Sequence, residues 1–447
     1  MQTRTSCAKG AADRPAWSRG ALLRGFWRAP VLAASLGVGL LAGCALPGGQ
    51  GGSTRAGVEL PMRVADAPKP SREAQSLDDA VRDLTVSLFD RARIDPPTGS
   101  GRYDLVIDPL IDRATGSQNT TTRGMETRMA EIVRTRYPDF ALRPFGTESL
   151  AQQPIVLMGA ITAVAGPGII PASSNARPGT YRIWAVLGDL RTGKVVSHET
   201  AWVRAENVDP TPTAFFRDSP AWAAETITEA YLQTCARDPG EPIDPRYLEA
   251  LQAQAQLADG IRAYEAGRYE AALVSYEAAA AQPGGDALKA RNGAYLSNRA
   301  MGRADAAEQA FGRVVDYGLD HGTLAVKFLF RPGTTAFWPN REISGDYPMW
   351  LRQIAERSAP RNICLDLNGH ASPTGATAWN ERLSLGRAQT VRQELVEQRP
   401  VLAQRTEAQG LGASMPLIGT GTDDLTDALD RRVEFITEAC PIRQAAR

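Results

Sequence analysis

The sequence predicts an α+β protein built from several domains. Its 447 residues correspond to about three domains of ordinary size. In residues 72–240 and 322–440, apolar segments typical of strands alternate with segments whose apolar residues recur at helical spacing, whereas residues 245–320 have helical spacing throughout. We therefore expect an α/β domain, a short pair of helical repeats and a C-terminal domain of strands and helices, in that order.

Residues 1–43 have the features of a targeting segment and are left out of the fold prediction. Basic residues precede an apolar run at 31–41 that is too short to cross a bilayer as a stable helix. The run ends in Leu-Ala-Gly-Cys at 41–44, which resembles the lipobox of bacterial lipoproteins. This resemblance implies a lipid on Cys44, and because Ala45 rather than Asp follows, it favours the periplasmic face of the outer membrane. An ordinary signal peptide with an incidental cysteine is the alternative.

Composition excludes some function classes. Residues 44–71 are rich in Gly, Pro and small residues and predict a flexible tether. The chain has 50 basic and 50 acidic residues, but six basic residues lie in the first 43 positions, so the remainder is acidic. This charge disfavours nucleic acid as a partner. With three histidines and no clustered cysteines, we expect no metal site and no cofactor.

Residues 72–240 predict one α/β domain. We expect helices at 76–90, 122–136 and 221–234, and strands at 103–110, 140–145, 154–161, 181–190 and 195–203, the last two forming a hairpin. Asp108 and Asp112 follow a strand, and we interpret them as solvated loop carboxylates rather than an acid/base pair. The chain has no nucleophile elbow, phosphate loop or H-E-x-x-H motif. We therefore predict that the protein is not an enzyme.

The same domain is similar to the periplasmic domains of lipoprotein activators of penicillin-binding proteins and of the curli-secretion lipoprotein. The similarity rests on Leu-Val-Ile-Asp-Pro-Leu-Ile-Asp at 105–112, the helix at 120–136, the strand at Val156 and the hairpin turn at Gly193. It implies a domain that binds an envelope protein partner. Candidate partner surfaces are the turn-rich loop at 166–179 and the aromatic segment at 210–222, although the latter also fits a loop that covers the core.

Residues 247–318 contain an internal repeat. Three positions recur 35 residues later, namely Gly267 as Gly302, Ala272 as Ala307 and Tyr276 as Phe311. This pattern resembles the tetratricopeptide repeat, in which small residues let antiparallel helices approach and an aromatic residue fills the groove between them. Two copies are too few to bury a continuous core, so we expect the pair at 245–320 to pack on a neighbour and to act as a spacer or partner surface.

Residues 363–395 predict a strand, a loop and a helix. Apolar residues alternate at 363–367, and helical spacing begins near Trp379. The segment resembles the OmpA-like peptidoglycan-binding domain, whose pattern here is G-[YH]-T-D-x-x-G-x-x-x-x-N-x-x-L-S-x-x-R-A-x-x-V. The matching residues are Gly369, His370, Gly375, Asn380, Leu383, Ser384, Arg387, Ala388 and Val391. The runs at 409–416 and 430–435 resemble later parts of the family pattern, so the resemblance covers an OmpA-like domain at 322–440 and implies a βαβαββ fold of two layers.

The resemblance implies non-covalent binding of the diaminopimelate in a peptidoglycan stem peptide. The guanidinium of Arg387 would clamp the ligand carboxylate through two parallel hydrogen bonds. Asn380 would order the loop, and Arg431 would add charge at the rim or serve the structure. Ser372 stands where the family has an aspartate, and its hydroxyl supplies no charge for the ligand ammonium. Two interpretations stay open: weakened peptidoglycan binding, and a fold that has lost its ligand.

Three cysteines remain in a compartment that favours disulfides. Cys364 lies in the strand at 363–367, and Cys440 ends the predicted closing strand. If both strands belong to one sheet, we expect a disulfide between Cys364 and Cys440 that leaves Cys235 unpaired.

These observations predict a protein that links the outer membrane to peptidoglycan without cleaving it, through a lipid at Cys44 and the domain at 322–440. Two alternatives remain. The domain at 72–240 could activate a cell-wall synthase that the C-terminal domain only places. The chain could instead be an envelope or secretion scaffold whose OmpA-like domain has lost ligand binding.

Overall fold

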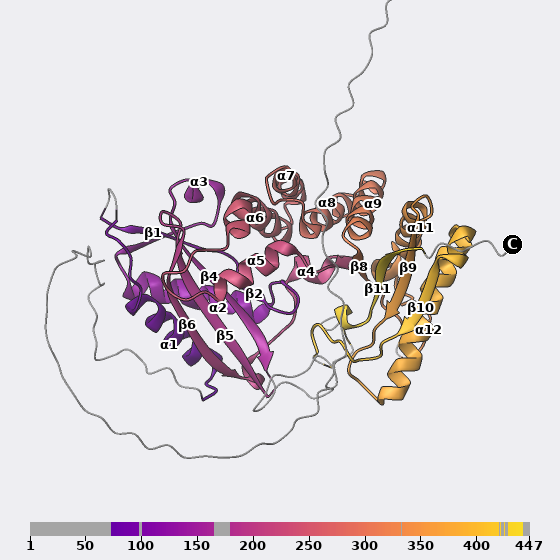
Figure 1. Cartoon of the computed structure of the whole chain (residues 1–447), viewed down its shortest axis with the longest axis horizontal. Coiled ribbons are helices and arrows are strands. Elements are labelled where there is room, and N and C mark those ends of the chain that lie inside the picture. The colour runs from indigo at the N-terminus through magenta and orange to yellow at the C-terminus, as the bar shows by residue number, and fades with distance from the viewer. Residues whose placement is uncertain are drawn as a thin grey trace, which may run out of the picture. The chain divides into compact units, whose positions relative to one another are not determined.

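The structure is a computed structural model that describes residues 73–97, 101–164, 179–331, 333–419, 421, 424 and 428–440. The predicted signal peptide, the tether, Cys44 and nearly all of the loop at 166–179 lie outside the described residues. Within these ranges helices combine with two mixed sheets (Figure 1), which confirms the α+β class. No helix in the described ranges is both long and apolar enough to cross a lipid bilayer.

The first sheet combines parallel and antiparallel pairs. Its strands are β1 (Tyr103–Ile107), β2 (Ile111–Asp112), β3 (Phe140–Arg143), β4 (Ile155–Val164), β5 (Thr180–Asp189) and β6 (Lys194–Arg204). The strand order is β3-β1-β4-β5-β6, with β2 beside β4. β1 runs parallel to β3 and β4, whereas β4, β5 and β6 pair antiparallel. The hairpin predicted at 181–190 and 195–203 therefore corresponds to β5 and β6.

Helices cover both faces of this sheet (Figure 1). One face holds α1 (Leu77–Asp90) and α2 (Thr120–Arg136), and the other holds α5 (Thr226–Cys235) and α6 (Pro245–Glu265), while α3 (Thr147–Leu150) is a single turn. Successive residues of β4 enter different cores, because Leu157 packs on the side of α1 and Met158 on the side of α5. Burial on both faces explains why the run at 154–161 is apolar without alternation.

The interpretation of Asp108 as a solvated carboxylate is wrong. Asp108 is 6% exposed, and its Oδ2 accepts a 2.6 Å hydrogen bond from the hydroxyl of Tyr247 on α6. Burial raises the pKa of Asp108 to about 7, although the bond from Tyr247 acts in the opposite direction. Asp112 instead accepts bonds from the backbone N–H groups of Ala114 and Thr115, which close the turn after β2.

Four helices follow in the segment of the predicted repeats. They are α6, α7 (Tyr269–Ala280), α8 (Leu288–Ala300) and α9 (Ala304–Asp320). Tyr276 is fully buried against Gly260 and Gly293, where an added Cβ would lie 2.7 and 2.4 Å from its ring. Phe311 stacks on Trp350 of α11 (Tyr347–Ser358), with 5.3 Å between the ring centroids. The helices therefore pack on the C-terminal domain as well as on one another.

The second sheet has the strand order β10-β9-β11-β8-β7. Its strands are β7 (Ala221–Trp222), β8 (Thr323–Lys327), β9 (Ile363–Gly369), β10 (Thr406–Gly410) and β11 (Arg432–Ala439). β9 pairs parallel with β10 and antiparallel with β11, and β8 pairs antiparallel with β11 and β7. α10 (Arg341–Ser344) and α11 connect β8 to β9, and α12 (Thr377–Gln398) connects β9 to β10.

The sequence predicts a helix from residue 221, whereas the structure has a strand there. Ala221 pairs with Val326 at the edge of the second sheet, and α5 begins only at Thr226. The preceding helix α4 (Ala214–Asp218) buries Phe215 completely. The aromatic segment at 210–222 thus packs Phe215 against Tyr264 and Tyr276 and adds a short edge strand to the second sheet. A strand of two residues is too short to show periodicity, which explains the wrong assignment.

We expect Asp108→Asn to raise stability near pH 8 much more than near pH 4. A carboxyl group whose pKa is raised from near 4 to about 7 on folding destabilises the fold as pH rises through this window. Asn keeps an acceptor for Tyr247 but has no proton to lose. Three pKa units correspond to a gain on the order of 4 kcal/mol in the free energy of unfolding.

Chemical denaturation of the unsubstituted protein and Asp108→Asn at the two pH values tests this expectation. Asp139→Asn, at an exposed carboxylate, is the matched control and should show little difference between them. A gain for Asp108→Asn that does not depend on pH would contradict the buried-charge explanation.

Candidate functional site

The candidate site lies where β9 ends and β11 begins. β9 closes at Gly369, and the loop at 370–376 leads into α12. Val433 of the antiparallel strand β11 lies opposite Gly369, so the residues just before β11 reach the same edge of the sheet (Figure 1). This register brings Ser372 next to Arg431 across 59 residues of sequence.

Two glycines let α12 lie directly on the sheet. A Cβ at Gly369 would come within 2.1 Å of the carbonyl oxygen of Ser384, and a Cβ at Gly410 within 2.5 Å of that of Glu381. Both contacts involve helix backbone, which has little freedom to move aside. A side chain at either position would therefore push α12, and Arg387 with it, away from the site.

The structure brings three of the predicted site residues together. Arg431 donates from Nη1 to the Oγ of Ser372 at 2.9 Å and from Nη2 to the carbonyl oxygen of Asp424. Asn380 donates from Nδ2 to the carbonyl oxygens of Thr374 at 2.8 Å and Ser372 at 3.4 Å. All three side chains are buried. The Asn380 amide fixes the turn before α12, and Arg431 contacts the hydroxyl that stands at the family's acidic position.

Arg387 is held by a segment that the sequence analysis did not include in the site. Its guanidinium lies over the ring of Phe330, 5.0 Å from the centroid, and its Nε donates to the carbonyl oxygen of Thr334 at 3.2 Å. The side chain is only 4% exposed. The sequence signal is the aromatic residue that ends the apolar run at 326–330. Because β8 stops at Lys327, Phe330 leaves the sheet and is available to stack on the guanidinium.

Asp430 fastens a loop beside the site. Its Oδ1 accepts hydrogen bonds from the backbone N–H groups of Leu417 at 2.6 Å and Ile418 at 2.8 Å, and its Oδ2 accepts one from Gly419 at 2.8 Å. An amide has a single acceptor oxygen with two lone pairs, so an asparagine at this position would have to give up at least one of these three bonds.

A second buried network lies at the start of β11. Arg432 donates from Nε and Nη2 to Glu434, both at 2.8 Å, and His370 Nε2 lies 3.3 Å from the same carboxylate. Burial by itself raises the pKa of Glu434, but the neighbouring His370 and the charge of Arg432 outweigh it and lower this pKa to about 2. Burial also lowers the pKa of His370. At neutral pH the network therefore holds an ion pair beside an uncharged imidazole.

Cys364 on β9 and Cys440 after β11 form a disulfide, with their Cα atoms 4.9 Å apart. Cys235 is buried in α5 as a free thiol. The disulfide joins neighbouring strands and encloses the 76-residue stretch that carries α12 and the candidate site.

No family model matches the chain. Over 92 residues, which are 20% of this chain, the sequence is 35% identical to outer membrane protein Omp38 of Acinetobacter baumannii, with the same values for proteins from two strains. The match covers 26% of Omp38, so the chain spans about a quarter of the length of the curated relatives it matches.

Three solved structures are similar to part of the chain. The peptidoglycan-associated lipoprotein from Burkholderia pseudomallei is 25% identical with a TM-score of 0.21, over 26% of this chain and 89% of that one. The periplasmic domain of Helicobacter pylori MotB is 15% identical with a TM-score of 0.22, over 27% and 74%. A putative MotB-like protein from Desulfovibrio vulgaris is 26% identical with a TM-score of 0.22, over 27% and 75%.

We expect Glu434→Gln to lower the free energy of unfolding by about 3–5 kcal/mol at neutral pH, because the charge of Arg432 would stay buried without its counter-ion. Glu356→Gln is the matched control. Its partner Arg399 lies 3.1 Å away, but both side chains are exposed, so the loss should stay below about 1 kcal/mol. Denaturant titration measures both changes, and equally small losses would show that the Arg432–Glu434 pair is not important for stability.

Proposed function

We propose that the protein is a periplasmic lipoprotein that links the outer membrane to peptidoglycan. A lipid on Cys44 would hold the membrane, and the C-terminal domain would bind diaminopimelate in the stem peptide without cleaving it. The likeness to an outer membrane protein over 92 residues supports the placement in the envelope. The lipobox resemblance at 41–44 supports the anchor, and the OmpA-like pattern supports the ligand.

The observation that carries this proposal is a pair of buried guanidinium groups near the end of β9. Arg387 comes from α12 and Arg431 from the residue before β11, and both are at most 5% exposed. A guanidinium binds a carboxylate through two parallel, charge-assisted hydrogen bonds. Such bonds are stronger away from water, which favours a buried position for the diaminopimelate carboxylate.

Ser372 would face the ammonium end of the ligand. Its Oγ already accepts a bond from Arg431, and an oxygen of a hydroxyl has a second lone pair that can accept a bond from an ammonium. Without a full negative charge this contact is weaker than the family's carboxylate. Tethering offsets a modest affinity, because a lipid anchor holds the domain at high local concentration near the wall.

We expect the protein without residues 1–44 to co-sediment with purified peptidoglycan, and Arg387→Ala to weaken binding by about tenfold or more, as loss of a charge-assisted pair implies. Residues 45–447 are used whole, because β7 and Phe311 complete the sheet and core of the C-terminal domain. Arg382→Ala, at an exposed position of the same helix, is the matched control and should bind like the unsubstituted protein.

Ser372→Asp is expected to bind peptidoglycan more tightly than the unsubstituted protein, because it adds the charge that an ammonium prefers beside an existing counter-ion, Arg431. The same sedimentation assay measures this change. If the unsubstituted protein stays in the supernatant while Ser372→Asp sediments, the domain has kept its fold and lost its ligand, and the proposed link to the wall is refuted.

A further inference from the structure

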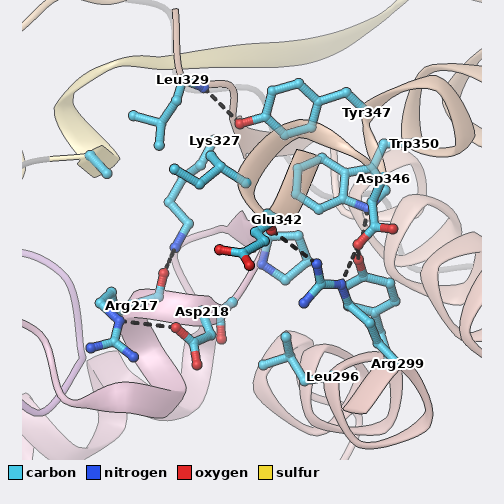
Figure 2. Close-up of a pocket in the computed structure, with 15 residues that line it drawn as sticks. Arg217, Asp218, Leu296, Arg299, Lys327, Leu329, Glu342, Asp346, Tyr347 and Trp350 are labelled. Carbon is cyan, nitrogen blue, oxygen red and sulfur yellow. Dashed lines mark hydrogen bonds and ion pairs between the residues drawn. The ribbon is translucent and has the colours of Figure 1, made fainter. Parts of the chain in front are cut away.

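A cavity of about 180 Å³ lies among four parts of the chain (Figure 2). Its lining comes from α4 and the turn after it, from α8, from β8 with the helices α10 and α11, and from Ala428. Leu296, Leu329 and Ile343 give the cavity an apolar wall. Arg387, Ser372, Asn380 and Arg431 are not among its lining residues, although the carbonyl oxygen of Ala428 accepts a hydrogen bond from the backbone N–H of Arg431.

Six charged side chains line the cavity, and four of them pair with one another. Arg217 lies 3.0 Å from Asp218, and Arg299 contacts Asp346. Asp346 also accepts a 2.8 Å hydrogen bond from the hydroxyl of Tyr295. These four charges are therefore paired within the protein (Figure 2).

The other two charges, on Lys327 and Glu342, have no side-chain counter-ion among the described residues. Lys327 donates from Nζ to the carbonyl oxygens of Phe216 at 3.2 Å and Arg217 at 2.7 Å, which uses two of its three N–H groups. No hydrogen bond in the described part of the chain reaches the carboxylate of Glu342. Figure 2 shows the charged ends of Lys327 and Glu342 directed toward the same space.

The environment of Lys327 favours an added anion. Burial lowers the pKa of its ammonium to about 8, with Asp218 acting in the opposite direction and Arg217 in the same one. A cation that is removed from water without a counter-ion costs free energy, and a carboxylate placed beside it would recover part of that cost. The unused N–H group of Lys327 provides the donor.

We propose that this cavity binds a small zwitterion, with the ligand carboxylate on Lys327 and the ligand ammonium on Glu342. The ligand is a free amino acid or a short peptide, which share this pair of charges. A simple anion would satisfy Lys327 but would bring a second negative charge toward Glu342. A simple cation could contact Glu342 but would leave Lys327 without a counter-ion. A zwitterion alone matches both groups, and the apolar wall accommodates the carbon chain between its charges.

Calorimetric titration of the protein without residues 1–44 tests the proposal. The probes are glycine, β-alanine, 4-aminobutanoate, 6-aminohexanoate and glycylglycine, with propanoate and propylammonium as single-charge controls. We expect at least one zwitterion to bind about tenfold more tightly than either control, because it makes two charge-assisted contacts instead of one. Tighter binding of glycylglycine than of the amino acids would assign the cavity to short peptides, and the reverse order to free amino acids.

Variants identify the two contacts. Lys327→Met should weaken the preferred zwitterion about tenfold or more, while Lys327→Arg keeps the charge and should retain part of the binding. Glu342→Gln removes one charge at an exposed position and should bring the zwitterion close to propanoate in affinity. Lys194→Met, at an exposed lysine on β6 outside this cavity, is the matched control and should bind normally.

Three results would overturn the proposal: no probe binds, propanoate binds as tightly as every zwitterion, or the preferred zwitterion binds either Glu342→Gln or a folded Lys327→Met without loss. Melting curves of the variants show whether each one is folded before it is titrated. Because Glu342→Gln lies at an exposed position, its outcome decides the question even if Lys327→Met unfolds.

Discussion

The stack of Phe311 of α9 on Trp350 of α11 joins the four helices α6–α9 to the core beside the second sheet. Both ends of this helical segment pack on a sheet, since Leu324 of β8 contacts Gly318 of α9 at one end. At the other end, Tyr247 of α6 enters the core of the first sheet. β7 adds a strand from the N-terminal half of the chain to the second sheet. The cavity beside Lys327 forms where these elements meet, because its lining residues come from the helices α4, α8, α10 and α11 and from β8.

Close backbone packing positions the candidate wall-binding site. Because Gly369 and Gly410 leave no side chain between α12 and the sheet, the helix lies at a fixed depth over β9 and β10. Arg387 is then placed by the helix, Ser372 by the loop that Asn380 ties down, and Arg431 by the register of β11. Ser372 and Arg431 thus meet through backbone constraints, whereas Arg387 is held against Phe330 and Thr334.

Motif spacing predicted the parts of the site that lie close together in sequence, and tertiary contacts decided the rest. The run from Gly369 to Arg387 fixes a strand, a turn and a helix, since each residue type has a local role there. The burial of Asp108 could not be predicted, because its partner Tyr247 is 139 residues away. The partners of Lys327 are equally distant in sequence, because its ammonium donates hydrogen bonds to carbonyl groups more than 100 residues earlier in the chain. A lysine within the apolar run at 326–330 indicates an unusual position for a charge, but it does not indicate which carbonyl groups the lysine contacts.

Arg431 and Arg432 are adjacent in sequence, but their side chains have different partners because only Arg432 belongs to β11. Arg432 is the first residue of β11 and forms a buried ion pair with Glu434, two positions along on the same face of the strand. Arg431 precedes the strand and reaches the hydroxyl of Ser372 at the end of β9. The charge of Arg432 is thus paired within β11 through Glu434, whereas Arg431 joins the residue before β11 to the loop that follows β9. A step of one residue therefore separates a contact along one strand from a contact between two segments that lie 59 residues apart.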